Sequence, residues 1–326
     1  MNRKVSGAWK LRGLAFAALA AVSMVAQAQA WPAKPVKIIV PYPPGGAVDV
    51  VTRKMAQRLS EQTGQSFYVE NKAGATGTIG TAQVARAAPD GYMLLANDTT
   101  YALLPHIFKA LPFDPAKDLQ PVAAYVFAPM GVVVKAGGKY KTLADLIAAA
   151  KADDKVSYGS GGAGSTPHFA SEALGLAAGA HFMHVPFKGA GEATVALLGG
   201  TVDFQMASIP GVIGQVKGNK LAVLAVSGSK RLPALAQVPT FAEAGVSGFG
   251  VTNFTGLWAP KGTPAEVVER LQKEVSRAMA TADMRAYADS IGAEPGYWDA
   301  ATFRTEVASR TAFWGKVAHG TAFQKQ

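Results

Sequence analysis

From residue 36 onward, the chain alternates short apolar runs with amphipathic stretches. The β-branched run from Val36 to Val40 stops at Pro-Pro-Gly-Gly, after which Val48, Val51, Met55 and Leu59 recur at helical spacing. This pattern predicts a strand, a glycine turn and a helix.

The same unit recurs along both halves of the chain. Strands that alternate with helices predict parallel sheets, and ligands of such sheets sit beyond the carboxyl ends of the strands. No short sequence period accompanies the recurrence, so we expect two α/β lobes facing a common cleft and not a solenoid. The predicted strands are 67–69, 92–96, 131–135, 156–160, 181–185, 202–207, 221–226 and 251–259; the predicted helices are 79–86, 142–151, 264–279, one that starts at Pro167 and one that ends at Gly199-Gly200; and the predicted loops are 71–77, 97–101 and 186–191.

We expect the chain to cross between the lobes twice, near 129–134 and near 252–258. The C-terminal helices need a sheet to cover, and the first lobe is otherwise short. Lobe 1 would then comprise 31–129 plus 253–326, and lobe 2 would comprise 130–252. On this division, helix 264–279 packs on lobe 1.

The first 30 residues read as a cleaved signal peptide. An apolar run at 14–25 is too short to span a bilayer, and Ala-Gln-Ala at 28–30 matches a cleavage site before Trp31. We therefore expect export to the periplasm. Four basic residues precede the apolar run: Arg3, Lys4, Lys10 and Arg12.

Cysteine is absent, which excludes disulfides, thiol nucleophiles and a lipid-anchoring cysteine. Cleavage would remove four of the 32 basic residues and none of the 22 acidic ones, so the mature chain keeps a formal net charge of +6. The remaining Lys and Arg residues are scattered and form no continuous stripe. We therefore expect no nucleic-acid partner, and a mild positive field that favours small anions.

The stretch SYGSGGAGSTPHF, residues 157–169, places Gly159, Gly161 and Gly164 at G-x-G-x-x-G spacing. A dinucleotide site needs an acidic residue about 20 positions further on, and the segment AGAHFMHVPF contains none. A strand that leads through glycines into Ser165-Thr166-Pro167 is instead typical of an anion site at a helix N-terminus. The alternative is that Thr166 only caps its own helix.

Other catalytic sequence motifs are incomplete or absent. Ser-Gly-Ser-Lys at 227–230 matches S-x-x-K without its companion motifs, and no G-x-S-x-G or P-loop occurs. His181 and His184 fall on a predicted strand, where they would point to opposite faces, so we expect no metal site there. His168 is the one histidine in a candidate ligand loop. It either contacts the ligand or has a structural role.

Several long motifs in order resemble the substrate-binding proteins of tripartite tricarboxylate transporters, the Bug receptors. They are WPAKPVKIIVPYPPGGAVD, VENKAGATGTIG, APDGYMLL, SYGSGGAGSTPHFASE, HVPFKGAGEA, LLGGTVDF, AVSGSKRLPALAQVPTFAEAG and GLWAPKGTP. The resemblance implies the two-lobed type II periplasmic binding protein fold (Venus flytrap), with a mainly parallel sheet flanked by helices in each lobe. It also implies a monomer that closes on a small organic carboxylate, uses no cofactor, metal or catalytic residue, and docks transiently on membrane transporter subunits.

Two departures from the family concern the ligand. Ala47-Val48 stands where the family commonly has a hydroxyl-bearing pair. Only the backbone amides of Gly46 and Ala47 can then bind the ligand at this loop. Ala207-Ser208 stands where many members have an aspartate after the strand. Both departures make a less polar or larger ligand conceivable.

We expect the segment from Tyr42 to Ala47 to bind one end of the ligand, and Ser165, Thr166 and the amides of 162–164 to bind the other. Asp49 either orients the first loop or only stabilises its helix. Closure should depend on ligand, with an open form dominant in its absence. The predicted ligand-binding residues are Tyr42, Gly45, Gly46, Ala47, Asp49, Thr76, Gly77, Asn97, Thr99, Thr100, Ser160, Gly162, Gly164, Ser165, Thr166, His168, Phe187, Lys188 and Ser208.

Two other functions remain open at this stage. A secreted hydrolase would act on a carboxylate ester or amide through a serine or histidine in the cleft. A ligand-loaded partner of a sensor protein would share the site and differ only in its docking surface.

Overall fold

A computed structural model describes residues 31–326 except 154, 248, 250 and 322, so the predicted signal peptide lies outside the described residues. The strands are β1 (Val36–Val40), β2 (Phe67–Asn71), β3 (Met93–Asp98), β4 (Leu119–Lys135), β5 (Ser157–Ser160), β6 (Met183–Pro186), β7 (Phe204–Ser208), β8 (Leu221–Val226), β9 (Thr252–Pro260) and β10 (Glu294–Trp298). The helices are α2 (Ala47–Thr63), α3 (Thr78–Ala85), α4 (Thr100–Ile107), α5 (Leu143–Ala152), α6 (Thr166–Ala178), α7 (Ala190–Gly199), α8 (Ile213–Lys217), α9 (Ala265–Met279), α10 (Ala282–Ser290) and α11 (Ala300–Gly320), with single 3-10 turns η1 (Ala75–Gly77), η2 (Ile209–Gly211) and η3 (Pro233–Leu235).

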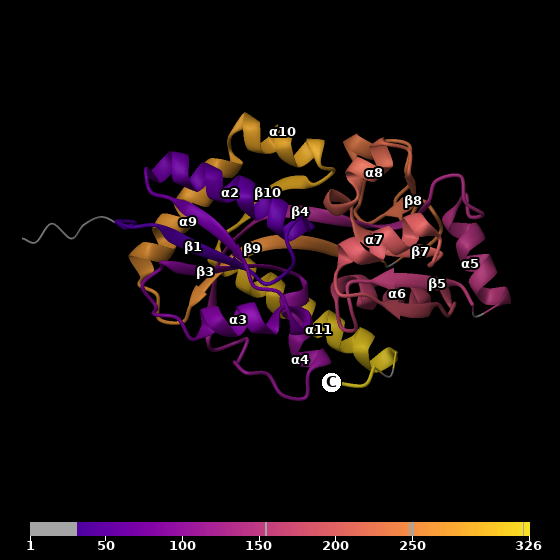
Figure 1. Cartoon of the computed structure of the whole chain (residues 1–326), viewed down its shortest axis with the longest axis horizontal. Helices are drawn as coiled ribbons and strands as arrows, with labels where there is room; N and C mark the ends of the chain where they lie inside the picture. Colours follow the sequence, from indigo (N-terminus) through magenta and orange to yellow (C-terminus); the bar gives the residue numbers. More distant parts are fainter. Residues whose placement is uncertain (1–30, 154, 248, 250, 322) are drawn as a thin grey trace, which may run out of the picture.

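The first half is a sheet in the order β2-β1-β3-β9-β4, with helices on both faces (Figure 1). Helix α9 covers one face together with α2, because Val267, Leu271, Val275 and Ala278 form a stripe at helical spacing that is buried in the same core as β1. Helices α3, α4 and α11 bury their apolar residues on the other face. The predicted helix 264–279 therefore packs on the sheet that contains β1.

The second half contains β6-β5-β7 with β4 and β8, and it is covered by α5 to α8. Among the described residues, four strand pairings are parallel and five are antiparallel. The strands around β1 and β5 are parallel as expected, but the sheets are mixed and not mainly parallel. The reason is that β4 and β9 run antiparallel to their neighbours.

Strand β4 belongs to both halves. Up to Pro129, which lies opposite Thr252, it pairs with β9 and β10. From Met130, which lies opposite Ser208, it pairs with β7 and β8. The change of partner occurs inside the range 129–134 expected for a crossing between the lobes, although the sequence predicted only residues 131–135 of this strand.

Helix α11 also contacts both halves. It packs against α4 of the first half and α6 of the second, and its Phe303 and Trp314 are buried. The His106 imidazole in α4 lies 2.8 Å from the Thr311 carbonyl oxygen in α11. Among residues 31–326 that the structure describes, no helix is long and apolar enough to cross a bilayer.

Candidate functional site: a cavity between the two halves

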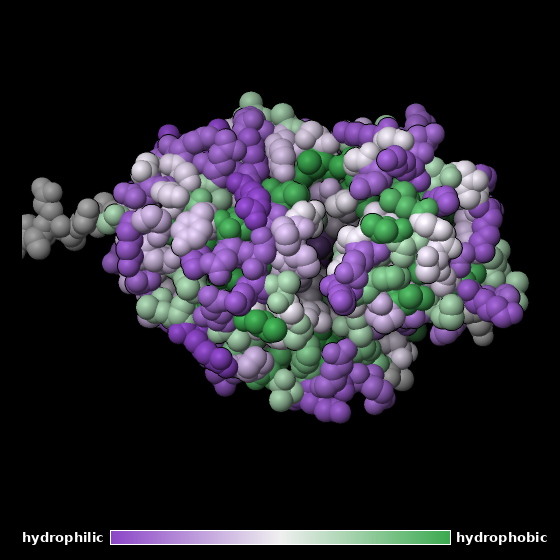
Figure 2. Space-filling view, viewed as in Figure 1, coloured by the Kyte–Doolittle hydropathy of each residue, from purple (hydrophilic) through white to green (hydrophobic). Residues whose placement is uncertain are grey.

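A cavity of about 390 Å³ lies between the two halves. Figure 2 shows the surface hollowed at this junction. The loops that follow β1, β2 and β3 line it from the first half, and the loops that follow β5, β6 and β7 line it from the second. The loops therefore converge at the carboxyl ends of the strands, as expected for α/β sheets.

Two helices begin at the cavity wall, one from each half. Helix α2 begins after Gly46 and α7 begins after Gly189, and neither of these N-cap residues provides a side-chain cap. Gly46 and Ala47 line the cavity on one side, and Ala190 and Gly191 line it on the other. Because the first amides of a helix have no partner within the helix, both ends present N–H donors and a positive dipole end to the cavity.

Asp49 fixes the loop that precedes α2. Its buried carboxylate accepts hydrogen bonds from the Gly45 amide (2.9 Å), from Arg53 Nε (3.0 Å) and from Asn71 Nδ2 (2.9 Å). Burial opposes the charged form, but the hydrogen bonds from Arg53, Gly45 and Asn71 outweigh it and lower the pKa of Asp49. Asn71 also donates to the Tyr42 carbonyl oxygen (3.0 Å), so one network holds both ends of the loop.

The first turn of α7 is held by Gln205 of β7. The Gln205 side chain is buried; its Nε2 donates to the Ala190 carbonyl oxygen (3.2 Å) and its Oε1 accepts from Thr194 Oγ1 (2.9 Å). These two bonds fix the helix end that points at the cavity. Gln205 is thus a positioning residue for this wall.

The two halves also touch around the cavity. Thr100 Oγ1 and Thr166 Oγ1 lie 2.8 Å apart and both residues are buried, while Thr76 Oγ1 donates to the Ala163 carbonyl oxygen at 3.4 Å. These bonds join α4 to α6 and the loop after β2 to the loop after β5. The structure therefore has the halves in contact.

Thr166→Val is expected to lower the free energy of unfolding by about 1–3 kcal/mol, because it leaves the Thr100 hydroxyl buried without this partner. Adding Thr100→Val should restore part of the loss, since replacing both partners by groups of the same shape is less costly. Urea unfolding of wild type, both single variants and the double variant measures this coupling. Strictly additive losses would contradict it.

The glycine stretch at 159–164 forms the turn that leads from β5 into α6, and Gly161 and Ser165 line the cavity. Ser165, and not Thr166, is the N-cap of α6: its Oγ accepts from the His168 amide (3.4 Å) and donates to the Gly162 carbonyl oxygen (2.7 Å). Gly162 and Gly164 adopt φ of 119° and 82°, which favours glycine. The expectation that Thr166 caps the helix is wrong, because its hydroxyl is directed to Thr100.

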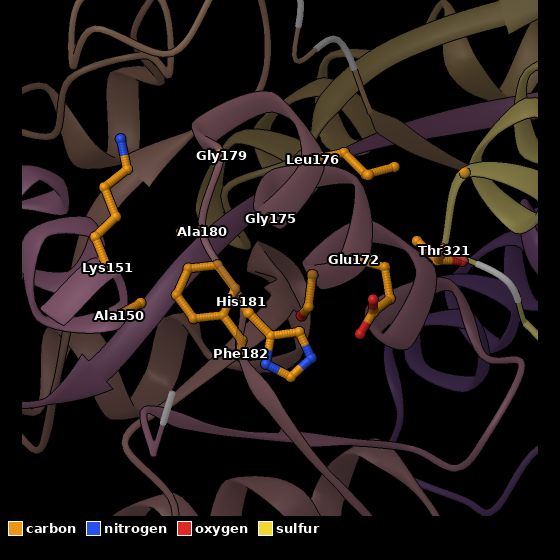
Figure 3. A pocket seen from close by; sticks show the side chains of 12 residues that line it. Ala150, Lys151, Glu172, Gly175, Leu176, Gly179, Ala180, His181, Phe182 and Thr321 are labelled. Atoms are coloured by element: carbon orange, nitrogen blue, oxygen red, sulfur yellow. The ribbon is translucent and has the colours of Figure 1, made fainter. Parts of the chain in front are cut away.

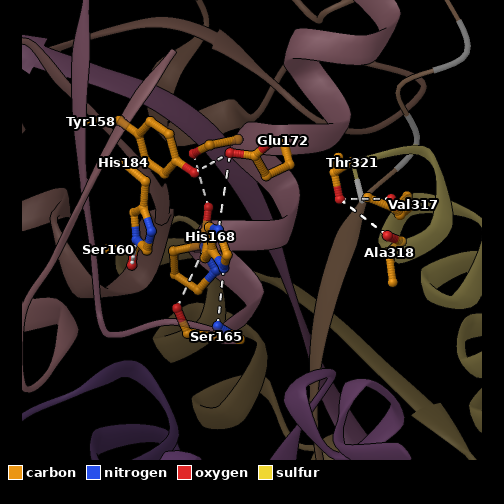
Figure 4. Close-up of polar contacts among 12 residues, drawn as sticks. Tyr158, Ser160, Ser165, His168, Glu172, His184, Val317, Ala318 and Thr321 are labelled. Atoms are coloured by element: carbon orange, nitrogen blue, oxygen red, sulfur yellow. Dashed lines mark hydrogen bonds and ion pairs between the residues drawn. The ribbon is translucent and has the colours of Figure 1, made fainter. Parts of the chain in front are cut away.

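Two histidines lie behind this stretch (Figure 4). The His168 and His184 rings stack at 4.0 Å, His168 Nδ1 accepts from the Gly164 amide (3.0 Å), and His184 Nε2 lies 2.6 Å from Ser160 Oγ. Burial, and then the proximity of His184, lower the pKa of His168 to about 3, and burial lowers that of His184 to about 4. Both are therefore neutral at pH 7, and His168 supports the glycine turn.

The predicted site residues divide into two groups. Ten line the cavity: Tyr42, Gly45, Gly46, Ala47, Thr76, Gly77, Thr100, Ser165, Lys188 and Ser208. The other nine lie outside its lining, mostly in the layer that supports it: Asp49, Asn97, Thr99, Ser160, Gly162, Gly164, Thr166, His168 and Phe187. Ser208 lines the cavity, but its hydroxyl oxygen is buried and has no hydrogen-bond partner among the described residues.

Sequence reasoning missed part of the lining. The cavity is also lined by Ala190, Gly191 and Glu192 at the start of α7, by Asp98 at the end of β3 and by Asn253 at the start of β9. The signal for this second helix N-terminus is the pair of glycines in the predicted loop at 186–191, directly before a helix. No local signal marked Asn253, which reaches the site only because β9 crosses back beside β3.

A second depression, of about 580 Å³, lies on the outer side of α6 (Figure 3). Lys151, Glu172, His181 and Thr321 are among its lining residues, and it includes none of the predicted site residues. Glu172 accepts a 2.5 Å hydrogen bond from the Tyr158 hydroxyl. Over the described part of the chain, no group of three or more His, Cys, Asp or Glu residues could hold a metal ion.

A family model described as the tripartite tricarboxylate transporter family receptor matches residues 51–321. The chain belongs to this family. A protein from the tcbD-tcbE intergenic region of Pseudomonas sp. strain P51 is 36% identical over 276 residues, which cover 84% of this chain and 82% of that protein. Protein BugT of Bordetella pertussis is 33% identical over 310 residues, which cover 94% of this chain and 95% of BugT. The resemblance to the Bug receptors is thereby confirmed.

Solved structures of periplasmic binding proteins have the same fold as this receptor. R. palustris Rpa4515 with adipate matches with a TM-score of 0.87 at 31% identity, over 91% of this chain and 100% of that one. The periplasmic binding protein BugD matches with a TM-score of 0.85 at 31% identity, over 91% and 100%. MatC from Rhodopseudomonas palustris with bound malate matches with a TM-score of 0.81 at 29% identity, over 88% and 100%. The two-lobed periplasmic-binding-protein fold expected from the sequence is confirmed.

Proposed function

We propose that this tripartite tricarboxylate transporter receptor captures a small organic carboxylate in the cavity between its two halves. The observation that carries the proposal is the pair of uncapped helix N-termini, α2 and α7, that line the cavity from opposite sides. A carboxylate taken out of water needs several donors at once, and neither half supplies them alone. The relatives that carry adipate and malate support this ligand class.

The two halves act as lobes in this proposal. Lobe 1 comprises 31–129 plus 253–326 and lobe 2 comprises 130–252, and the change of partner within β4 supports the first crossing. Closure brings the start of α7 to the start of α2, so it depends on ligand and an open form dominates without it. The receptor works as a monomer that is exported to the periplasm after loss of residues 1–30 and docks transiently on the membrane subunits of its transporter.

The proposal includes no catalysis. The Ser–His pair that a hydrolase would need occurs at Ser160 and His184, 2.6 Å apart, but Ser160 is fully buried and lies outside the lining of the cavity. A substrate in the cavity would not reach that hydroxyl. The burial of Ser160 therefore favours the receptor over the hydrolase.

A carboxylate panel tests the function. Mature protein is titrated by calorimetry against mono-, di- and tricarboxylates and amino acids, and each mixture is then analysed for product. We expect at least one compound to bind at micromolar concentration or tighter, to raise the unfolding temperature and to remain unchanged. Hydrolysis of ester or amide analogues, or no binding across the panel, would contradict the proposal.

A further inference from the structure

The charged side chains that line the cavity are unusual for a site that binds only anions. Three lining residues carry a formal charge, namely Asp98, Lys188 and Glu192, and two of these three are acidic. Lys188 and Glu192 lie together at the start of α7, where the Lys188 amide donates to Glu192 Oε2 (3.2 Å). Asp98 lies at the end of β3 in the other half.

Asp98 is surrounded by donors that use only part of its capacity. Its Oδ1 accepts from the Tyr42 hydroxyl (2.9 Å) and from the Thr100 amide (2.9 Å), and its Oδ2 accepts from Asn253 Nδ2 (3.1 Å). An ionised carboxylate has about four acceptor positions, so Asp98, which lines the cavity, retains acceptor capacity beyond these three bonds. No basic side chain of the described residues forms an ion pair with it.

Tyr42 extends this acceptor surface. Its hydroxyl donates to Asp98 Oδ1 and also lies 2.6 Å from Asn97 Oδ1, so its single proton is already used within the protein. Burial and the nearby Asp98 carboxylate raise the pKa of the Tyr42 phenol well above its usual value, which keeps that proton in place. Towards a ligand, the Tyr42 oxygen therefore acts as an acceptor.

The cavity thus has two chemically different parts. The starts of α2 and α7 offer N–H donors, whereas Asp98 and Tyr42 offer oxygen acceptors. Glu192 lies in the first turn of α7, beside the donors of that helix, and adds a negative charge there. A second carboxylate placed near Asp98 would meet a like charge, and this is costly in a partly dry site. A positively charged donor placed there would find an unpaired acceptor.

We propose that the ligand is an amino acid, in which a carboxylate bound at the helix N-termini is accompanied by an ammonium group held by Asp98, with Glu192 adding favourable charge at the opposite wall. This inference rests on the proposed function and narrows its ligand class. It predicts selection against unsubstituted dicarboxylates of the same length. Selection arises because the charge that attracts the ammonium group repels a second carboxylate.

The test compares matched compounds on the mature receptor by calorimetric titration. One set contains dicarboxylates of three to six carbons, and the other contains α- and ω-amino monocarboxylates of the same lengths. We expect the best amino acid to bind at least about tenfold more tightly than the best dicarboxylate, the factor that corresponds to about 1.4 kcal/mol. Asp98→Asn should reduce or reverse this preference by at least about tenfold, and Glu192→Gln should shift it in the same direction by a smaller factor.

Two controls keep the test interpretable. Asp289→Asn removes the same charge from an exposed position on α10 and should leave the preference unchanged. Glu192 is exposed, so Glu192→Gln is expected to fold normally even if Asp98→Asn is unstable. Tighter binding of dicarboxylates by wild type, or an unchanged preference in Glu192→Gln and in folded Asp98→Asn, would overturn the inference while leaving the carboxylate receptor intact. Binding of neither set would overturn the receptor function as well.

Discussion

Ala47→Glu is expected to abolish ligand binding while the protein remains folded. Ala47 is the first residue of α2 and lines the cavity. A carboxylate introduced there would occupy the amides at the helix N-terminus and repel the carboxylate of the ligand. Because a hydrogen bond to a charged group contributes about 1.5–3 kcal/mol, loss of two such bonds should weaken binding by at least about 100-fold.

The same substitution should not destabilise the receptor, because an acidic residue in the first turn of a helix is favourable by about 0.3–1 kcal/mol. Ala265→Glu is the matched control: it places the same side chain at the first residue of α9, at an exposed position outside the cavity lining. Thermal unfolding and calorimetric titration of both variants separate the two effects. Normal affinity in Ala47→Glu would show that the α2 N-terminus does not bind the ligand.

Asp49→Asn is expected to impair both stability and binding. The asparagine cannot accept from Gly45, Arg53 and Asn71 at once, because one of its two terminal atoms becomes a donor. We expect the free energy of unfolding to fall by about 1–3 kcal/mol, at the lower end of what buried ion pairs give, since Arg53 is half exposed. Affinity should fall by about tenfold, because the loop that presents Gly46 loses its support.

The loss of stability in Asp49→Asn should depend on pH. The folded state lowers the pKa of Asp49, so its contribution is fully present above the unfolded value of about 3.9 and is lost as the pH falls through the folded value. Wild type and variant should thus differ most at neutral pH and converge in strong acid. Asp283→Asn serves as the control: it removes a half-exposed carboxylate that pairs with Lys54 at 3.0 Å, with an expected change of about 0–1 kcal/mol. An equal loss in the free energy of unfolding in the two variants would show that Asp49 contributes no more than an ordinary surface charge.

The hydrophobic spacing along the chain predicted those strands and helices that bury one continuous run or one face. The run from Val36 to Val40 and the helical spacing from Val48 to Leu59 correspond to β1 and α2. The stripe of α9 was equally visible, because one face of that helix is buried and the other is charged. Asp49 was recognised as a possible organiser of its loop because it lies in the first turn of α2.

The sequences of other elements show no clear hydrophobic period. Helix α4 contains Pro105 and is buried over most of its length, so its sequence resembles a loop followed by an apolar run. The first part of β4 is buried on both faces and shows no alternation between residues 119 and 130. Strand β10 contains Pro295 and Gly296, which are both uncommon in strands.

The lining of the cavity matches the predicted residues more completely in the first half than in the second. The sequence predicted ligand contacts along the glycine stretch before α6; in the structure these glycines form a turn, Ser165 caps α6, and Ser165 is the one residue predicted between 160 and 168 that lines the cavity. The cavity is lined more extensively by the start of α7, whose position depends on Gln205 in a distant strand. Contacts between elements far apart in the chain cannot be read from the local pattern.

A crystal structure of the mature receptor with the carboxylate identified by titration tests the central claim most directly. We predict that the ligand carboxylate lies within hydrogen-bonding distance of the amides of Gly46 or Ala47 at the start of α2 and of Ala190 or Gly191 at the start of α7. A carboxylate bound outside this cavity, or bound by neither helix start, would contradict the account.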